Sequence, residues 1–180
     1  WWSISTRPSL PTLSPIDVID TAQTFREAAA LHRQGLLGQA ERLYRAVLEQ
    51  APDHTEALHL LGVLRAQNKD YAAAVSLIQQ AAERDPNNPT IQYNLANVLR
   101  DLGRLDDSLS PYAKADALEP TRTAALTNRG TVLCALGRFE EALVDFDLAL
   151  TRDSNDAALL INRGNALVAL DRNEIGRAHV

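Results

Sequence analysis

The chain has 180 residues, of which 46% are hydrophobic and 23% are charged, values close to those of folded soluble proteins. This composition excludes wholesale disorder, and the net charge of −5 argues against a nucleic-acid partner, because general nucleic-acid binders are usually basic. Aromatic residues make up only 5%, so alanine and leucine must fill the core, which favours closely packed helices. No run of about 18 apolar residues is present, so we expect neither a membrane-spanning segment nor a membrane partner.

The first 20 residues differ from the rest of the chain. They carry Pro8, Pro11 and Pro15 among serines and threonines, a pattern typical of a linker or irregular lead-in, and we expect at most a short helix after Ser14. The sequence contains no methionine, so we interpret it as an internal fragment of a longer protein, upstream of which a signal peptide could lie. The single cysteine rules out an internal disulfide and favours a reducing, cytoplasmic location.

A 34-residue repeat dominates the remainder of the chain. Its copies begin at residues 21, 55, 89, 123 and 157, the last of them incomplete, and together they cover residues 21–174. Within each copy apolar residues recur at spacings of three and four, which is typical of amphipathic helices. We therefore predict helices over the following ranges: 22–34, 37–50, 55–67, 71–84, 89–101, 105–118, 123–136, 139–152 and 157–170.

Aligning the repeats shows which positions hold the helices together. Position eight is always alanine or glycine, position twenty is alanine or serine, and position twenty-four carries a ring or a branched side chain. Small residues let antiparallel helices approach closely, and the bulky residue then fills the space between them. Glycine occupies the turn at position fifteen in three repeats, but Lys69 and Asp171 replace it elsewhere, so we expect those two turns to differ.

The C-terminal residues leave the pattern. The fifth repeat keeps its register through Glu174, but residues 175–180 do not continue the expected amphipathic helix. This string resembles the translation of a common short-read sequencing adapter, so we interpret it as an assembly artefact and exclude it from functional reasoning. Without a second helix beside it, the helix at 157–170 would expose apolar residues such as Leu160 and Leu167. We expect this face to be sticky and able to self-associate, although the sequence does not determine the oligomeric state.

The aligned residues resemble the tetratricopeptide repeat (TPR), a helix–turn–helix unit of 34 residues. Position seven, usually leucine in that family, departs from the pattern as Glu27, Arg129 and Arg163. The resemblance implies an all-α fold, a right-handed α-solenoid of antiparallel helix pairs. It also implies that the first helix of each pair lines a concave groove, with repeat positions two, five, six, nine, twelve and thirteen pointing into it.

Asparagines recur at positions six and nine of the later repeats, inside the implied groove. An asparagine amide offers two donors and an acceptor, so a ladder of them can bind an extended peptide backbone whatever its side chains. Such a ladder resembles the inner surface of the TPR superhelix in O-linked N-acetylglucosamine transferases, although packing or solubility can also explain the asparagines. With the ring and cation positions beside them, the predicted partner-binding residues are His59, Tyr93, Asn94, Asn97, Arg100, Asn128, Thr131, Asn162 and Asn165.

The groove lacks one residue that some TPR proteins need. The TPR clamp for chaperone C-terminal carboxylates relies on a lysine at position five. Here that position holds His59, Tyr93, Thr127 and Ile161 in repeats two to five. We therefore do not expect the chain to be a receptor for chaperone tails.

No set of residues in the sequence predicts catalysis, a metal site or a cofactor. His54 and His59 are five residues apart, not the four of the helical metalloprotease motif, and no phosphate-binding glycine loop is present. Cys134 has no evident histidine partner, so we expect a packed thiol. Paired acids such as Glu140 and Glu141 open second helices, where they favour the positive end of the helix dipole.

Three functions follow from these features. The first is a protein–protein interaction scaffold without enzymatic activity, which binds an extended peptide or partner segment in the groove. The second is a substrate-recruiting arm of a larger enzyme, because strings such as Asn128-Arg129-Gly130 resemble repeats that precede glycosyltransferase domains of the O-linked N-acetylglucosamine transferase type. The third is a component of an assembly or secretion system, in which the convex face also contacts partners.

Overall fold

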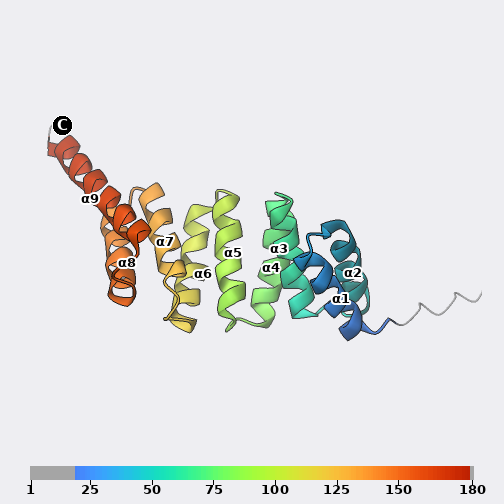
Figure 1. The fold of residues 1–180 in the computed structure, drawn as a ribbon. Helices are drawn as coiled ribbons and strands as arrows, with labels where there is room; N and C mark the ends of the chain where they lie inside the picture. The colour runs from blue at the N-terminus through green and yellow to red at the C-terminus, as the bar shows by residue number, and fades with distance from the viewer. Residues whose placement is uncertain (1–18, 179–180) are drawn as a thin grey trace, which may run out of the picture.

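The structure, a computed structural model, describes residues 19–178, with side chains described for residues 19–173. The prediction of an irregular lead-in at residues 1–20 therefore lies almost wholly outside the described residues. The described residues form nine helices and no strand, and successive helices stack side by side in one row (Figure 1). Their bounds are α1 Thr21–Arg33, α2 Leu37–Gln50, α3 Thr55–Gln67, α4 Tyr71–Arg84, α5 Pro89–Asp101, α6 Leu105–Leu118, α7 Ala124–Ala135, α8 Phe139–Arg152 and α9 Ala157–Ala178.

Polar side chains cap the start of several helices by accepting bonds from free backbone N–H groups. At α1 the carboxylate of Asp20 accepts a hydrogen bond from the backbone nitrogen of Gln23 at 3.0 Å. At α3 the ring of His54 has the same role, because its Nδ1 accepts from the backbone nitrogen of Ala57 at 3.2 Å. His54 therefore has a structural role at a helix start.

The turns within the repeats share one backbone conformation, and here one prediction is wrong. Gly35, Gly103 and Gly137 have φ angles of 77°, 83° and 73°, in the left-handed region that glycine adopts easily. Lys69 adopts the same conformation, with φ of 62°, so its turn does not differ from the glycine turns. The packing of α4 against α3 holds Lys69 there, although a side chain in this region costs about 1–2 kcal/mol.

The last helix is longer than the sequence analysis predicts. We expected a helix over 157–170 followed by an off-pattern tail, but α9 continues as one helix of 22 residues through Asp171 to Ala178. The physical reason lies at position seventeen, where the other repeats place an apolar residue that packs the second helix and this repeat has Asn173. With no such anchor after Asp171, nothing offsets the cost of a left-handed turn. Despite this length, none of the described helices is long and apolar enough to cross a membrane.

The core lies between the two helices of each repeat, where position twenty-four of the second helix meets position eight of the first. The bulky residues at position twenty-four are completely or almost completely buried, at 0–1% exposure. Tyrosine faces alanine in repeats one and three, whereas isoleucine or phenylalanine faces glycine in repeats two and four. The pairs are Ala28 with Tyr44, Gly62 with Ile78, Ala96 with Tyr112, and Gly130 with Phe146.

Candidate binding groove

The predicted partner-binding residues all lie on first helices, on α3, α5, α7 and α9. We call the side of these helices that carries repeat positions five, six, nine and twelve the groove face. A hollow of about 260 Å³ opens between α3 and α5 on this face. Its lining combines aliphatic and polar side chains and includes two of the predicted asparagines. The lining includes Val63, Ala66, Gln67, Asn94 and Asn97.

A second hollow of about 490 Å³ lies beside α1 and α3. His32, Arg33 and Gln67 line it together with the ring of Tyr44 and the side chain of Leu60. The His32 ring is already engaged, since its Nε2 lies 3.1 Å from Gln67 Oε1 and its Nδ1 lies 3.4 Å from the Tyr44 hydroxyl. The two hollows share Gln67, so they are neighbours along the array.

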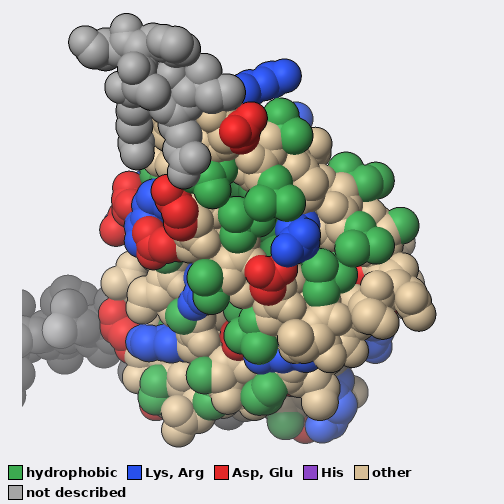
Figure 2. All heavy atoms as spheres, turned by 90° about the vertical axis from the view of Figure 1, so that its left-hand side faces the viewer, with side chains coloured by type: hydrophobic (Ala, Val, Ile, Leu, Met, Phe, Trp, Pro, Cys, Tyr) green, Lys and Arg blue, Asp and Glu red, His purple; other side chains and the backbone are tan. Residues whose placement is uncertain are grey.

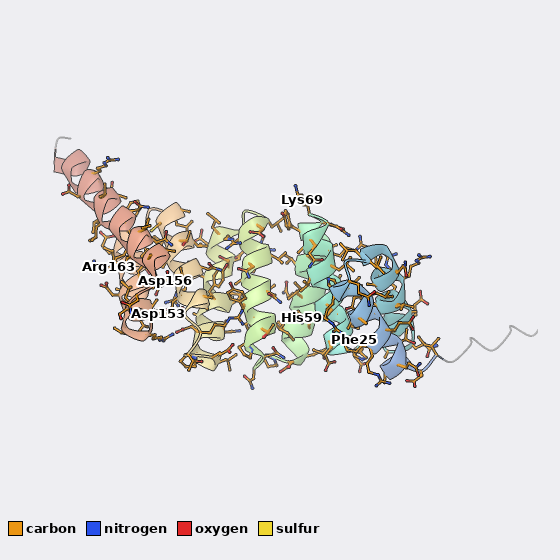
Figure 3. All side chains as sticks on the ribbon, viewed as in Figure 1. Phe25, His59, Lys69, Asp153, Asp156 and Arg163 are labelled. Atoms are coloured by element: carbon orange, nitrogen blue, oxygen red, sulfur yellow. The ribbon has the colours of Figure 1, made fainter. Side chains whose placement is uncertain are left out.

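His59 and Asn94 contact each other across adjacent repeats. His59 lies on α3 (Figure 3), and its Nε2 is 2.8 Å from Asn94 Nδ2 on α5. Burial lowers the pKa of His59, because a charged imidazole loses more hydration than a neutral one. The neutral ring accepts the hydrogen bond from the amide, and this bond fixes the orientation of Asn94.

A larger set of hydrogen bonds joins α5, α6 and α7. The Asn128 amide donates to the Tyr93 hydroxyl at 3.0 Å and to Asn97 Oδ1 at 3.2 Å. The Tyr112 hydroxyl donates to the same Asn97 oxygen at 2.7 Å. Burial raises the pKa of Tyr112 to about 12, so its hydroxyl keeps the proton that it donates. The asparagine ladder is therefore bonded internally through the middle of the array.

Arg100 extends this set of contacts but is not a free cation. Its Nη1 lies 3.4 Å from the Tyr112 hydroxyl, and its Nε and Nη2 donate to Asp101 Oδ1 at 3.0 and 2.8 Å. Asp101 compensates its charge within the same helix. An anionic ligand at this point would have to compete with that carboxylate.

The remaining predicted residues lie apart from this set. The Thr131 hydroxyl donates to the backbone oxygen of Thr127 in its own helix at 2.9 Å. Asn162 and Asn165 lie on α9, and neither makes a side-chain hydrogen bond with the described part of the chain. The ladder therefore has two halves, a bonded one on α5 and α7 and an open one on α9.

Sequence reasoning missed the part that Tyr112 has in this face. It treated position twenty-four as a space-filling position, yet the Tyr112 hydroxyl passes through the repeat to the groove side, and Tyr44 approaches His32 in the same way. A signal was present in the sequence. Where position twenty-four is tyrosine, position twelve is a histidine or arginine, whereas the other two complete repeats have Ala66 and Cys134 there.

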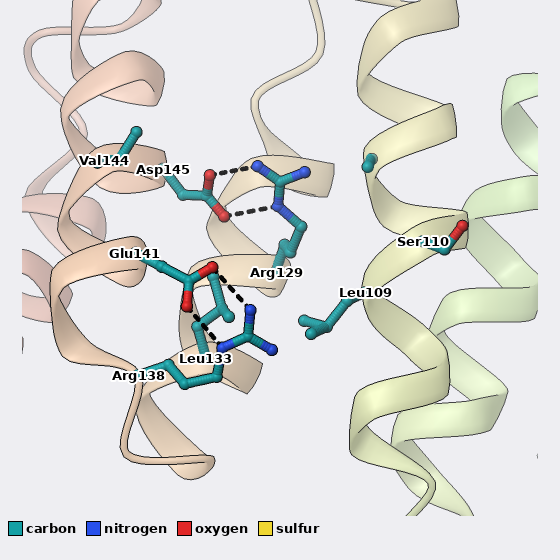
Figure 4. A pocket seen from close by; sticks show the side chains of 9 residues that line it. Leu109, Ser110, Arg129, Leu133, Arg138, Glu141, Val144 and Asp145 are labelled. Carbon is teal, nitrogen blue, oxygen red and sulfur yellow. Dashed lines mark hydrogen bonds and ion pairs between the residues drawn. The ribbon is translucent and has the colours of Figure 1, made fainter.

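A third hollow, of about 400 Å³, lies beside α6, α7 and α8 (Figure 4). Asp145, only 2% exposed, accepts two hydrogen bonds from Arg129, at 2.7 Å from Nε and at 2.5 Å from Nη2. Arg138 is paired with Glu141 in the same way at 2.7 Å. Each guanidinium group has its own carboxylate, so this hollow presents no unpaired charge.

The described residues were also searched for metal ligands and for a reactive thiol. No three histidine, cysteine, aspartate or glutamate side chains among them lie together in a way that could hold a metal ion. Burial raises the pKa of Cys134, which keeps its sulfur as a thiol rather than a reactive thiolate. This geometry fits the packed thiol that the sequence predicts.

Comparison with known sequences decides the family. Models of the tetratricopeptide repeat match residues 25–89, 65–127 and 122–152, which overlap and together cover residues 25–152. The chain belongs to the tetratricopeptide repeat family. The TPR matches therefore confirm the repeat that the sequence predicts, and the helical solenoid is the fold that this family forms.

The similar proteins cover different shares of the chain. Peroxisome biogenesis protein 5 of Arabidopsis thaliana is 35% identical over 66 residues, which are 37% of this chain and 9% of that protein. Among solved structures, one of MamA is 26% identical, with a TM-score of 0.71 over 82% of this chain and 80% of that one. YrrB, described as a TPR protein with an unusual peptide-binding site, is 23% identical, with a TM-score of 0.78 over 84% of this chain and 78% of that one, and this likeness concerns the fold alone.

Proposed function

We propose that this chain is a protein–protein interaction scaffold that binds an extended peptide or partner segment along its groove face. The TPR fold supports this proposal, because stacked helix pairs offer a long continuous surface. The YrrB neighbour, which has a similar fold, is described as having a peptide-binding site. The net charge of −5 favours a protein ligand over a nucleic acid.

The hollow between α3 and α5 carries the proposal. After its internal bonds, Asn97 still has its Nδ2 group and Asn94 its Oδ1 atom without a described partner. The contacts with His59 and Tyr112 hold these amides in place, so little side-chain entropy is lost when a peptide binds. A donor and an acceptor beside the aliphatic wall of Val63 fit a peptide backbone and one adjoining apolar side chain.

Two variants, each with one alanine replaced by phenylalanine, test this proposal. Peptides of about 12 residues are selected from a random displayed library against the full chain, and their dissociation constants are measured by fluorescence polarisation. Ala66→Phe fills the hollow, so we expect binding to weaken about tenfold or more. Ala72→Phe is the matched control, because Ala72 is exposed on α4 and does not line the hollow.

The circular dichroism spectrum of each variant establishes that it keeps its helices. If Ala66→Phe binds every selected peptide within about twofold of the unmodified chain, the hollow between α3 and α5 is not the binding site. A second pair of substitutions, Asn162→Ala with Asn165→Ala, removes no side-chain hydrogen bond among the described residues. Any loss of affinity in that variant therefore reports a direct contact with the peptide.

We also propose to which kind of larger protein this array belongs and where in the cell it is found. The asparagines at positions six and nine favour, as a second candidate, a substrate-recruiting arm of a glycosyltransferase. The relatives described above do not support that enzyme class, so we place the scaffold first. Sequencing the gene beyond the codon for Glu174 tests the second candidate, because a glycosyltransferase domain must follow if it is correct. The single half-buried cysteine supports a cytoplasmic location.

A further inference from the structure

The outer face of α9 repeats the face of α7 that receives α8. Four residues are identical at the same repeat positions, 34 residues apart, and we call the copy on α9 the α9 face. On α7 these residues are Leu126, Arg129, Gly130 and Leu133, and on α9 they are Leu160, Arg163, Gly164 and Leu167.

On α7, helix α8 packs over this set of residues, and only Arg129 among them stays partly exposed. Leu126 and Leu133 are 1% and 4% exposed, and the Phe146 ring lies directly over Gly130, where an added Cβ would come within 2.5 Å of it. Beside the ring, Asp145 forms the paired hydrogen bonds with Arg129. Two residues of α8 are therefore complementary to α7: the ring of Phe146 covers Gly130, and the carboxylate of Asp145 pairs with Arg129.

On α9 the same residues are uncovered. Leu160 is 50% exposed and Leu167 is 42% exposed, and an added Cβ at Gly164 would meet no atom within 4 Å. Arg163, labelled in Figure 3, bonds one partner among the described side chains, the exposed carboxylate of Asp147. Figure 2 shows hydrophobic side chains gathered at this end of the described chain.

This exposure is not that of a solvent-facing cap. Terminal repeats of soluble arrays have a polar outer face, because apolar surface in contact with water is unfavourable. The α9 face has an apolar rim, an open space above Gly164 and a guanidinium group whose carboxylate partner is exposed to solvent. On α7 the equivalent leucines are buried, Phe146 of α8 lies over the glycine, and Asp145 of α8 bonds the arginine.

We propose that the α9 face docks an amphipathic partner helix that carries a bulky apolar residue directly after an acidic one, as in Asp145-Phe146. The apolar side chain fills the space above Gly164, and the acid pairs with Arg163. A small residue four positions before the bulky one, equivalent to Ala142, lets the two helices approach. This docking site lies on the outer face of α9 and does not depend on peptide binding in the hollow between α3 and α5.

The probe for the test is a synthetic peptide with the sequence of residues 139–152, acetylated and amidated and labelled with fluorescein. A hydrocarbon staple joins positions 144 and 148, which are exposed in α8, because an isolated helix of this length is marginal in water. Fluorescence polarisation against the full chain measures its affinity. We expect saturable binding of one probe per chain.

Two protein variants determine where the probe binds. Gly164→Leu fills the open space and favours the helix, so the fold is kept while binding weakens about tenfold or more. Gly38→Leu is the matched control, because Gly38 also has no atom within 4 Å of an added Cβ and lies on α2. Arg163→Asp weakens the unmodified probe, and a probe with Asp145→Arg restores the affinity.

Three results would overturn the proposal. The first is the absence of saturable binding. The second is equal binding by Gly164→Leu, which would mean that the probe displaces α8 from α7 instead. The third comes from sedimentation equilibrium without probe, since a dimer that Gly164→Leu abolishes would identify a second copy of this chain as the occupant.

Discussion

Two glycines in the same local sequence should respond to alanine in opposite directions. Gly130 and Gly164 both follow Asn-Arg, but only Gly130 lies under a ring. In Gly130→Ala the new Cβ would lie 2.5 Å from Phe146 Cε1 and 2.9 Å from Cδ1 and Cζ, against an optimum of about 3.5–4.0 Å. The ring must therefore move by about 1 Å in a site where Phe146 is only 1% exposed.

The magnitudes follow from two opposing effects. Overpacking of this kind costs about 1–3 kcal/mol, and replacing glycine by alanine within a helix contributes about 1 kcal/mol of stability. Gly164→Ala has only the favourable effect, because no atom lies within 4 Å of its Cβ. We expect Gly164→Ala to stabilise by about 0.5–1 kcal/mol and Gly130→Ala to destabilise by about 1 kcal/mol.

Urea unfolding followed by circular dichroism at 222 nm measures the free energy of unfolding of the three proteins. Because terminal helices fray, amide hydrogen exchange in α9 accompanies the urea series as a local measure of stability. Phe146→Leu in the Gly130→Ala background provides a further check, since a smaller side chain should relieve part of the overlap. If Gly130→Ala is as stable as Gly164→Ala, the close packing of Phe146 on Gly130 is not a feature of the folded protein.

Three further predictions concern single side chains. Asp145→Asn leaves the guanidinium group of Arg129, 26% exposed, without its carboxylate and should destabilise by about 2 kcal/mol in the same urea assay. Lys69→Gly removes a left-handed side chain and should stabilise by about 0.5–1 kcal/mol, whereas Lys69→Ala, equally strained, should not. Because the pKa of His59 is lowered in the folded chain, the unfolded chain takes up this proton first as the pH falls. The contribution of the neutral His59 ring to the free energy of unfolding is therefore complete above the ordinary pKa of 6.5, and it is lost as the pH falls through the folded-state pKa. His59→Gln should therefore flatten the decrease in stability between about pH 7 and pH 5, and an unchanged pH profile would contradict this role.

Most of the helix map could be predicted from the sequence because each repeat carries the same local signals. For α2 through α6 and for α8 the predicted and observed bounds agree, and α1 and α7 differ from them by a single residue at each end. Glycine turns, capping residues and the small residue at position eight all act within one repeat. Two predictions failed where a neighbouring helix decides the outcome. The second helix holds Lys69 in its strained turn, and Asn173 provides no comparable anchor for a turn at Asp171.

The candidate site was harder to predict, because it depends on side-chain contacts between repeats. The TPR resemblance predicted which asparagines share one face, but it did not reveal that Asn128 bonds to Tyr93 and Asn97, one repeat away. The buried Asp145 was missed for a related reason. Arg129 was noted as unusual at its position, but its partner lies 16 residues later in the other helix of the repeat.

The local character of the contacts also determines how the chain can fold as it is made. Each helix packs on the next, and contacts that skip one helix are few. Ribosomes add about 5–20 residues per second, so a repeat of 34 residues takes about 2–7 s to emerge. Helices form and pack locally within about microseconds to milliseconds. Every helix pair can therefore be in place before the following one is synthesised, and the array grows from its N-terminal repeat in the order of translation.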